Sequence, residues 1–170
     1  MTNIEIKLRC LPDFQPHVWL ARLDLKTSGQ EIQQEDIYFY VTRGRLKLRR
    51  TGRTACLIRY ERSDESKGRE SRYEIVNVDD GEAMKNILAE HLGIRAVVKK
   101  RRLVYFWKNV RLHVDEVDGL GRFIEIESVT GEGISKNEAD ENFNEVYQAI
   151  PQGTAVPVAQ SYGELVLNNG

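Results

Sequence analysis

The stretch VRLHVDEVDGLGRFIEIES, residues 110–128, decides the fold because its pattern predicts a β-hairpin. Residues 110–117 alternate between apolar and charged side chains, and the alternation resumes after the turn residues Asp118 and Gly119. One face of this hairpin carries three carboxylates, those of Asp115, Glu125 and Glu127. Two glutamates placed two residues apart on a strand lie about 6–7 Å from each other. Carboxylates this close repel one another unless a positive group lies between them, so we expect cations near this face.

The same pattern, with one apolar face and one face bearing charges of both signs, recurs along the chain. In NIEIKLR, residues 3–9, the apolar residues alternate with Glu5, Lys7 and Arg9. Eight strands are predicted in total, at residues 3–9, 31–41, 45–50, 55–62, 71–78, 94–107, 110–117 and 121–128. Helices are predicted at residues 13–27, 80–92 and 135–149, with an exposed loop at 63–70 and a terminal helical turn at 161–167.

Strands that outnumber helices and follow one another as hairpins predict an α+β fold with an antiparallel sheet. The charged strand faces help to decide whether this sheet is open or closed. An open sheet would expose these faces to water, whereas a closed sheet would turn the charges inward, leave the apolar face for the helices to cover, and have no unpaired edge. Both arrangements remain possible from the pattern, and the closed antiparallel β-barrel of eight strands with flanking helices is favoured.

The composition indicates one folded domain over residues 1–170. Charged residues make up 30% and hydrophobic residues 41%, which excludes a disordered chain, and no apolar run approaches the roughly 20 residues of a transmembrane helix. The net charge is −1, whereas nucleic-acid-binding proteins usually carry a basic field, so we expect no DNA or RNA partner. The absence of a secretory segment before residue 3 predicts a cytoplasmic protein, and Cys10 and Cys56 lack the spacing of a zinc site.

The charged strand faces together predict a binding site for a polyphosphate with Mg²⁺ or Mn²⁺. The cations are Lys7, Arg9, Lys47, Arg49, Lys100, Arg102 and Arg111, and the carboxylates are Glu5, Asp115, Glu125 and Glu127. Arginine binds phosphate oxygens with two parallel hydrogen bonds, lysine acts as a point charge, and carboxylates supply the hard oxygen ligands that these metals prefer. Neither GxxxxGK[ST] nor GxGxxG occurs in the chain, so neither common nucleotide-binding loop explains the charges.

A solvated strand face or a lattice of salt bridges is the alternative explanation for any one of these residues. His113 is in phase with Asp115, and a lone histidine in such a position is expected to be a hydrogen-bonded neighbour rather than a ligand.

Several of these segments resemble the CYTH superfamily, whose members are class IV adenylyl cyclases, thiamine triphosphatases and inorganic tripolyphosphatases. They are NIEIKLR at 3–9, LKLR at 46–49, VKKRR at 98–102, HVDEVDGLGRFIEIE at 113–127 and SYGEL at 161–165, and they occur in the expected order. The resemblance implies an antiparallel eight-stranded tunnel in which basic residues bind a triphosphate and glutamates hold the metal. The VDEVDGLGRF hairpin at 114–123 and the YER segment at 60–62 look most like the cyclase branch.

Two positions depart from the family pattern. The E-x-E-x-K motif falls on Asn3, Glu5 and Lys7, so an amide replaces its first glutamate and one metal site could be weakened or lost. The lysine that the resemblance places in the fourth strand falls near Tyr60, with Arg62 in phase as a substitute ligand for phosphate.

Three functions are open at this point. In the first, the ribose 3′-hydroxyl of ATP attacks the α-phosphate, pyrophosphate leaves, and Lys7 with a lowered pKa acts as the base. In the second, a water molecule hydrolyses tripolyphosphate, thiamine triphosphate or a nucleoside triphosphate. In the third, the protein binds polyphosphate or nucleotide without turnover because of Asn3. The cyclase reading is favoured, and either a monomer or a homodimer is compatible with the sequence.

Overall fold

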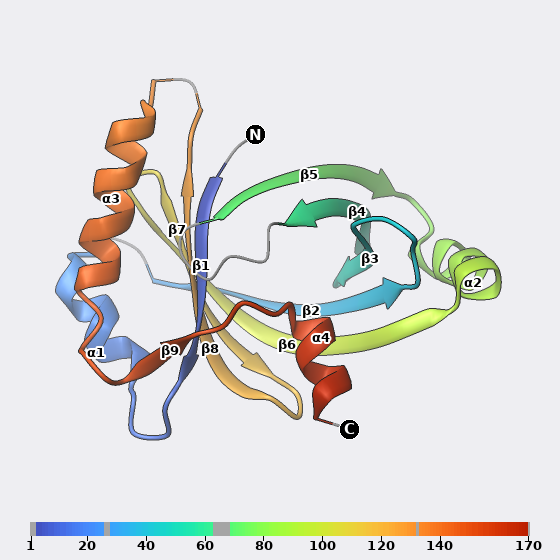
Figure 1. Ribbon diagram of the computed structural model, residues 1–170, viewed down its shortest axis with the longest axis horizontal. Coiled ribbons are helices and arrows are strands. Elements are labelled where there is room, and N and C mark those ends of the chain that lie inside the picture. Colours follow the sequence, from blue (N-terminus) through green and yellow to red (C-terminus); the bar gives the residue numbers. More distant parts are fainter. Residues whose placement is uncertain (1–2, 26–27, 63–68, 132, 170) are drawn as a thin grey trace.

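The computed structural model is built on one curved antiparallel sheet (Figure 1). It describes residues 3–25, 28–62, 69–131 and 133–169, and the side chains of these residues except 61–62 and 69–73. In this part of the chain the sheet has nine strands in the order β5-β4-β3-β2-β6-β7-β8-β1-β9. They are β1 (Asn3–Cys10), β2 (Gln30–Phe39), β3 (Arg45–Thr51), β4 (Thr54–Arg62), β5 (Arg69–Val78), β6 (Ile94–Trp107), β7 (Val110–Val117), β8 (Gly121–Val129) and β9 (Ala155–Pro157).

The predicted hairpin is confirmed. Strands β7 and β8 pair antiparallel from Val110 opposite Ser128 to Val117 opposite Gly121. Gly119 and Gly121 in the connection have φ angles of 72° and 88°, in the left-handed region that glycine adopts without a steric penalty. The hairpin therefore presents one regular face to each side of the sheet.

The predicted α+β antiparallel fold is confirmed, but a closed barrel of eight strands is not. A ninth strand, β9, pairs with β1 at Leu8–Cys10. Strand β5 also pairs with β1, over only two residue pairs, Ile4 with Glu70 and Glu5 with Arg69. Because β8 occupies the whole opposite edge of β1, strands β5 and β9 share the remaining edge. The three residues of β9, which end in a proline, are too few to show an alternating pattern.

Helices cover the apolar face of the sheet. In Figure 1, α1 (Pro16–Leu20) and α3 (Lys136–Gln148) lie outside β1, β7 and β8. Trp19 and Val146 are fully buried there against Leu112, Ile124 and Ile126, and the Trp19 indole donates a 3.1 Å hydrogen bond to the Val146 carbonyl. This layer is the main core, and it leaves the other face of the same strands for the charged residues.

The first helix is shorter than the predicted range 13–27. It begins at Pro16, because a residue that precedes proline disfavours the helical conformation and proline suits the first helical position. A 3₁₀ turn (Ala21–Leu23) follows and ends at Asp24, whose φ of 43° is left-handed. The predicted loop at 63–70 lies outside the described residues except for Arg69 and Glu70, which begin β5.

The remaining two helices pack against other strands of the sheet, α2 (Gly81–Leu92) against β2, β3 and β4, and α4 (Tyr162–Asn168) against β6. Helix α2 starts where predicted, with the Asp80 carboxylate accepting from two backbone amides, but none of its residues is buried. It packs Met84 and Leu88 only partly against the sheet. Helix α4 is the predicted terminal turn. No helix among the described residues is both long and apolar enough to cross a membrane.

Candidate functional site

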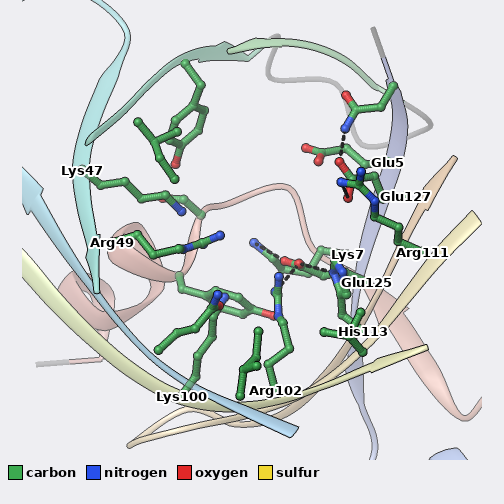
Figure 2. A pocket seen from close by; sticks show the side chains of 18 of the residues that line it. Glu5, Lys7, Lys47, Arg49, Lys100, Arg102, Arg111, His113, Glu125 and Glu127 are labelled. Carbon is green, nitrogen blue, oxygen red and sulfur yellow. Dashed lines mark hydrogen bonds and ion pairs between the residues drawn. The ribbon is translucent and has the colours of Figure 1, made fainter. Parts of the chain in front are cut away.

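A cavity of about 410 Å³ lies on the inward face of the sheet. In Figure 2, Lys47 and Arg49 reach into it from one side, and Lys100 and Arg102 from below. The predicted site residues that line it are Glu5, Lys7, Lys47, Arg49, Lys100, Arg102, Arg111, Glu125 and Glu127. These residues come from β1, β3, β6, β7 and β8, so the structure brings together most of the charged strand faces that the alternation predicts.

Strand register arranges one wall of the cavity in rows. Glu5 lies opposite Glu127, which lies opposite Arg111, and Arg111 lies opposite Phe106. The next row runs from Lys7 through Glu125 and His113 to Val104. Side chains directly opposite each other on neighbouring antiparallel strands have Cβ atoms about 4.5–5.5 Å apart. Each row is therefore a set of neighbours that face the same space.

A buried aspartate holds the cations of β3. Asp36 on β2 accepts hydrogen bonds from Lys47 Nζ at 2.9 Å and from Arg49 Nε and Nη2 at 2.7 and 2.8 Å. Burial alone would raise the pKa of Asp36, but Lys47 and Arg49 outweigh it and hold that pKa well below its usual range. Burial, followed by the charge of Arg49, lowers the pKa of Lys47 to about 8.

A second buried aspartate holds the cations of β6. Asp115 is fully buried and accepts from Arg102 Nε and Nη2, both at 2.6 Å, and from the Tyr162 hydroxyl at 2.7 Å. Lys100 Nζ lies 3.6 Å from the same carboxylate. Burial, followed by the charge of Arg102, lowers the pKa of Lys100 to about 7. Asp115 therefore positions Arg102 and Lys100.

Lys7 and Glu125 lie side by side at the centre of the wall. Lys7 Nζ donates to the Gln160 carbonyl at 3.1 Å, lies 3.6 Å from Glu125 Oε1, and lies 4.0 Å from the centroid of the Tyr162 ring. Burial lowers the pKa of Lys7, although the carboxylates of Glu125 and Asp115 partly oppose this effect. Glu125 also accepts from Arg102 Nη2 at 2.5 Å, which helps to hold the pKa of Glu125 well below its usual range despite burial.

Glu5, Glu127 and Asn3 are the residues that could hold a divalent metal. Glu5 and Glu127 are opposite each other, and Asn3 donates its amide to Glu127 Oε1. Asn3 Oδ1 is buried and accepts no hydrogen bond, so it is an oxygen available for a cation. Mg²⁺ characteristically binds one or two carboxylates and completes its shell with water and substrate phosphates. This donor set fits such an ion.

The four carboxylates of the predicted metal site do not gather as one cluster. No group of three or more His, Cys, Asp or Glu side chains suited to a metal occurs among the described residues. Asp115 does not line the cavity, because Arg102, Lys100 and Tyr162 surround its oxygens, and Glu125 is bound to Arg102. The Asp115 oxygens bind Arg102 and Tyr162 and lie beside Lys100, and a role of Asp115 as a metal ligand stays a prediction.

One predicted phosphate ligand, Arg9, is not among the cavity-lining residues, and a second, Arg62, has no described side chain. The Arg9 guanidinium lies 5.2 Å from the centroid of the Phe123 ring, and Arg9 is not among the cavity-lining residues. Phe123 is opposite Arg9 and packs edge to face on Tyr162 at 5.1 Å, so aromatic rings fill the interior at that level. Arg62 ends β4, but its side chain lies outside the described ones.

Sequence reasoning did not select Asp36, Ser161 or Tyr162 as site residues, and it expected His113 to be a hydrogen-bonded neighbour. Asp36 shares the inward phase of β2 with Tyr38, and this alternation was the available signal for it. Ser161 and Tyr162 line the cavity from the start of α4, where no strand pattern exists. His113 lines the cavity with Nδ1 at 3.5 Å from Glu125 Oε2. Burial, followed by the charge of Arg102, lowers the pKa of this histidine.

The sequence and fold of this chain are similar to those of known proteins. The model of the CYTH domain family matches residues 1–162. The chain belongs to the CYTH family. A protein of Methanocaldococcus jannaschii named "Putative adenylate cyclase" is 27% identical to this CYTH chain over 175 residues, which cover 97% of this chain and 98% of that protein.

Solved structures share the fold of this CYTH protein. A conserved hypothetical protein from Pyrococcus furiosus matches with a TM-score of 0.77 at 27% identity, over 96% of this chain and 99% of that one. A Vibrio parahaemolyticus protein that carries the same cyclase name matches with a TM-score of 0.73 over 98% of each chain. Its identity of 17% shows the fold alone.

Proposed function

We propose that this CYTH protein binds ATP and a divalent metal in the sheet cavity and converts ATP to cyclic AMP and pyrophosphate. The observation that carries the proposal is that one cavity brings together six cationic side chains and the facing pair Glu5 and Glu127 among its described lining residues. The cyclase name of the M. jannaschii relative supports cyclisation over hydrolysis.

The cations supply the binding and the charge stabilisation that phosphoryl transfer requires. Arg49 and Arg102 are held by buried aspartates in fixed orientations, so their outer N–H groups are preorganised for phosphate oxygens. Lys47 and Lys100 add point charges beside them. Negative charge that develops on the leaving pyrophosphate would thus meet a positive surface. A divalent metal between Glu5 and Glu127 would neutralise further phosphate charge.

Lys7 is the proposed base. Its pKa is lowered by burial, so the neutral amine that accepts a proton is more accessible than in water. In the proposed step, the ribose 3′-hydroxyl gives its proton to Lys7 Nζ, and its oxygen forms a bond to the α-phosphorus. The bond from that phosphorus to the bridging oxygen breaks, and pyrophosphate leaves with the electron pair.

The products formed from three substrates test this proposal. Purified protein is incubated with Mg²⁺ or Mn²⁺ and with ATP, tripolyphosphate or thiamine triphosphate, and the products are separated by anion-exchange chromatography. Cyclic AMP and pyrophosphate in equal amounts are expected from ATP. Orthophosphate from any of the three would instead establish a triphosphatase, and binding without product would establish a sensor.

Glu127→Gln tests the metal role. The amide keeps the shape but removes the charge, so metal-dependent turnover should fall at least ~100-fold, the upper end of the loss seen when an outer-shell partner of a metal ligand is removed. Glu145→Gln on α3, where Glu145 pairs with Lys108 at the surface, is the matched control and should retain full turnover. Equal turnover in both variants, with unchanged circular dichroism, would remove Glu127 from the site.

A further inference from the structure

The lining of the cavity changes character along strand β6. Its inward residues run from Lys100 and Arg102 to Val104 and Phe106, so the wall passes from cationic to apolar within one strand. Ile32 on β2 also lines the cavity and lies opposite Arg102, which makes it a diagonal neighbour of Val104. These three apolar residues, Ile32, Val104 and Phe106, form what we name the apolar shelf.

The Phe106 ring is the exposed part of the shelf. Phe106 is 57% exposed although it lines a cavity, and no aromatic or cation–π contact among the described residues includes it. A phenylalanine left open to solvent in this way loses the free energy that burial of its ring would supply. An exposed apolar surface beside converging polar groups is typical of a ligand site.

The shelf is continuous with the proposed triphosphate site. Phe106 stands at the end of the row that contains Arg111, Glu127 and Glu5. Phe106 lies four positions after Arg102 along β6, about 13 Å at the rise of a strand. A ligand that reaches from the cations to the shelf must therefore carry a flat apolar group at one end and its phosphates at the other.

We propose that the apolar shelf binds the aromatic base of a nucleoside triphosphate whose phosphates lie among Arg49, Lys100 and Arg102. This inference rests on the proposed function, since it assumes that the cavity binds a triphosphate. It makes the natural ligand a nucleotide, because inorganic tripolyphosphate would leave the shelf in contact with water. Phe106 is then a specificity residue that stacks on the base, whereas the cations bind any triphosphate.

The test compares two ligands that share the triphosphate and differ in the base. They are ATP and tripolyphosphate analogues in which methylene groups replace the bridging oxygens between phosphorus atoms, so neither turns over, and both are titrated with Mg²⁺ by calorimetry. Phe106→Ala should weaken the ATP analogue about tenfold or more, the usual effect of removing one base-stacking side chain. Its affinity for the tripolyphosphate analogue should stay within twofold, and Phe106→Trp should retain both affinities.

Val97→Ala is the matched control. Val97 lies on the same strand with its side chain on the other face, and neither affinity should change in this variant. If Phe106→Ala weakens the two analogues equally, or neither of them, the shelf does not bind the base, while the proposed function stands. If the wild-type protein binds neither analogue, the proposed function fails, and the shelf proposal fails with it.

Discussion

Asp36 and Asp115 hold the cations of the cavity in place before any anion binds. Asp36 binds Lys47 and Arg49, and Asp115 binds Arg102 and lies beside Lys100. The side chains have therefore lost much of their conformational entropy on folding, and binding of a polyphosphate does not have to order them again. Burial has a second consequence, since it lowers the pKa of the two lysines toward neutrality.

Binding of a polyphosphate near pH 8 should take up protons. The pKa of Lys100 is about 7 and that of Lys47 about 8, so both amines are partly neutral at that pH in the free protein. Bound phosphate favours their charged forms and raises both pKa values. Affinity should therefore fall as the pH rises from 7 to 9 and level off below pH 6. Calorimetry in two buffers of different ionisation enthalpy measures the uptake directly.

Lys100→Met should reduce this proton uptake by the fraction of a proton that Lys100 gains when the polyphosphate binds. Lys85→Met is the control, because Lys85 pairs with Glu82 on the surface of α2, and it should bind with wild-type uptake. Binding of tripolyphosphate to the wild-type protein at pH 8 with no proton uptake would contradict the assigned charge states of both lysines.

Alternation predicted which strand residues face inward but not how deep the cavity is. Glu5, Lys7 and Arg102 were located by phase alone, since their strands are regular. Tyr162 lies 47 residues from Asp115 in the chain, and no local pattern indicates that its hydroxyl reaches that carboxylate. Arg9 is in phase with Lys7, yet Phe123 and Tyr162 occupy the interior beside it.

At the scale of elements, helix α4 is the part that closes the site. Its first turn is fixed by a capping box in which Ser161 accepts from the Glu164 amide and Glu164 binds back to the Ser161 amide. Arg45 Nη2 on β3 donates to Glu164 at 2.8 Å, and the hydrogen bonds from Arg45 and Ser161 lower the pKa of Glu164 to about 2 despite partial burial. This cap sets the position of Tyr162 beneath Lys7 and Lys100.

Ser161→Ala should weaken both the fold and the site. Loss of an N-cap side chain costs about 1 kcal/mol of unfolding free energy. Because α4 places Tyr162 in the cavity, tripolyphosphate affinity should fall as well. Urea denaturation and calorimetry measure the two effects.

Ser135→Ala is the matched control, since Ser135 caps α3 by accepting from the Glu138 amide at the surface. It should lose similar stability and bind tripolyphosphate normally. A loss of affinity in both variants would show that stability, rather than the position of α4, governs binding.

The helices and strands with the most regular side-chain pattern were the ones predicted most accurately. The long strands and α3 have uninterrupted periodicity, and their ranges were close to those observed. The first helix was overestimated because Pro16 and the left-handed Asp24 limit it more tightly than its apolar residues indicate. Strand β9 was missed because backbone pairing with β1, rather than any side-chain pattern, makes it a strand.

At the scale of the whole molecule, the curvature of the sheet concentrates cations in one interior space (Figure 2). The overall net charge is only −1, so the positive character of the cavity depends on placement and not on composition. Sequence could predict the inward charges but not which edge β5 would join, because β5 pairs with β1 over only two residue pairs that are far apart in the chain. The cations gathered in this space repel one another, and the buried carboxylates of Asp36 and Asp115 offset that repulsion.

Removal of one of these aspartates should make the fold depend on a bound anion. Asp36→Asn leaves Lys47 and Arg49 without their counter-charge in a largely buried setting, and breaking a buried pair costs about 3–5 kcal/mol of unfolding free energy. Tripolyphosphate supplies negative charge to the same two cations, so it should raise the melting temperature of the variant more than that of the wild-type protein. Thermal denaturation over a series of tripolyphosphate concentrations measures both shifts.

Glu35→Gln is the matched control, because Glu35 lies on the same strand and pairs with Arg50 and Lys99 on the outer face. This variant should lose at most about 1 kcal/mol of unfolding free energy, and tripolyphosphate should raise its melting temperature as much as that of the wild-type protein. Equal shifts in wild-type protein and Asp36→Asn would mean that the anion does not reach Lys47 and Arg49.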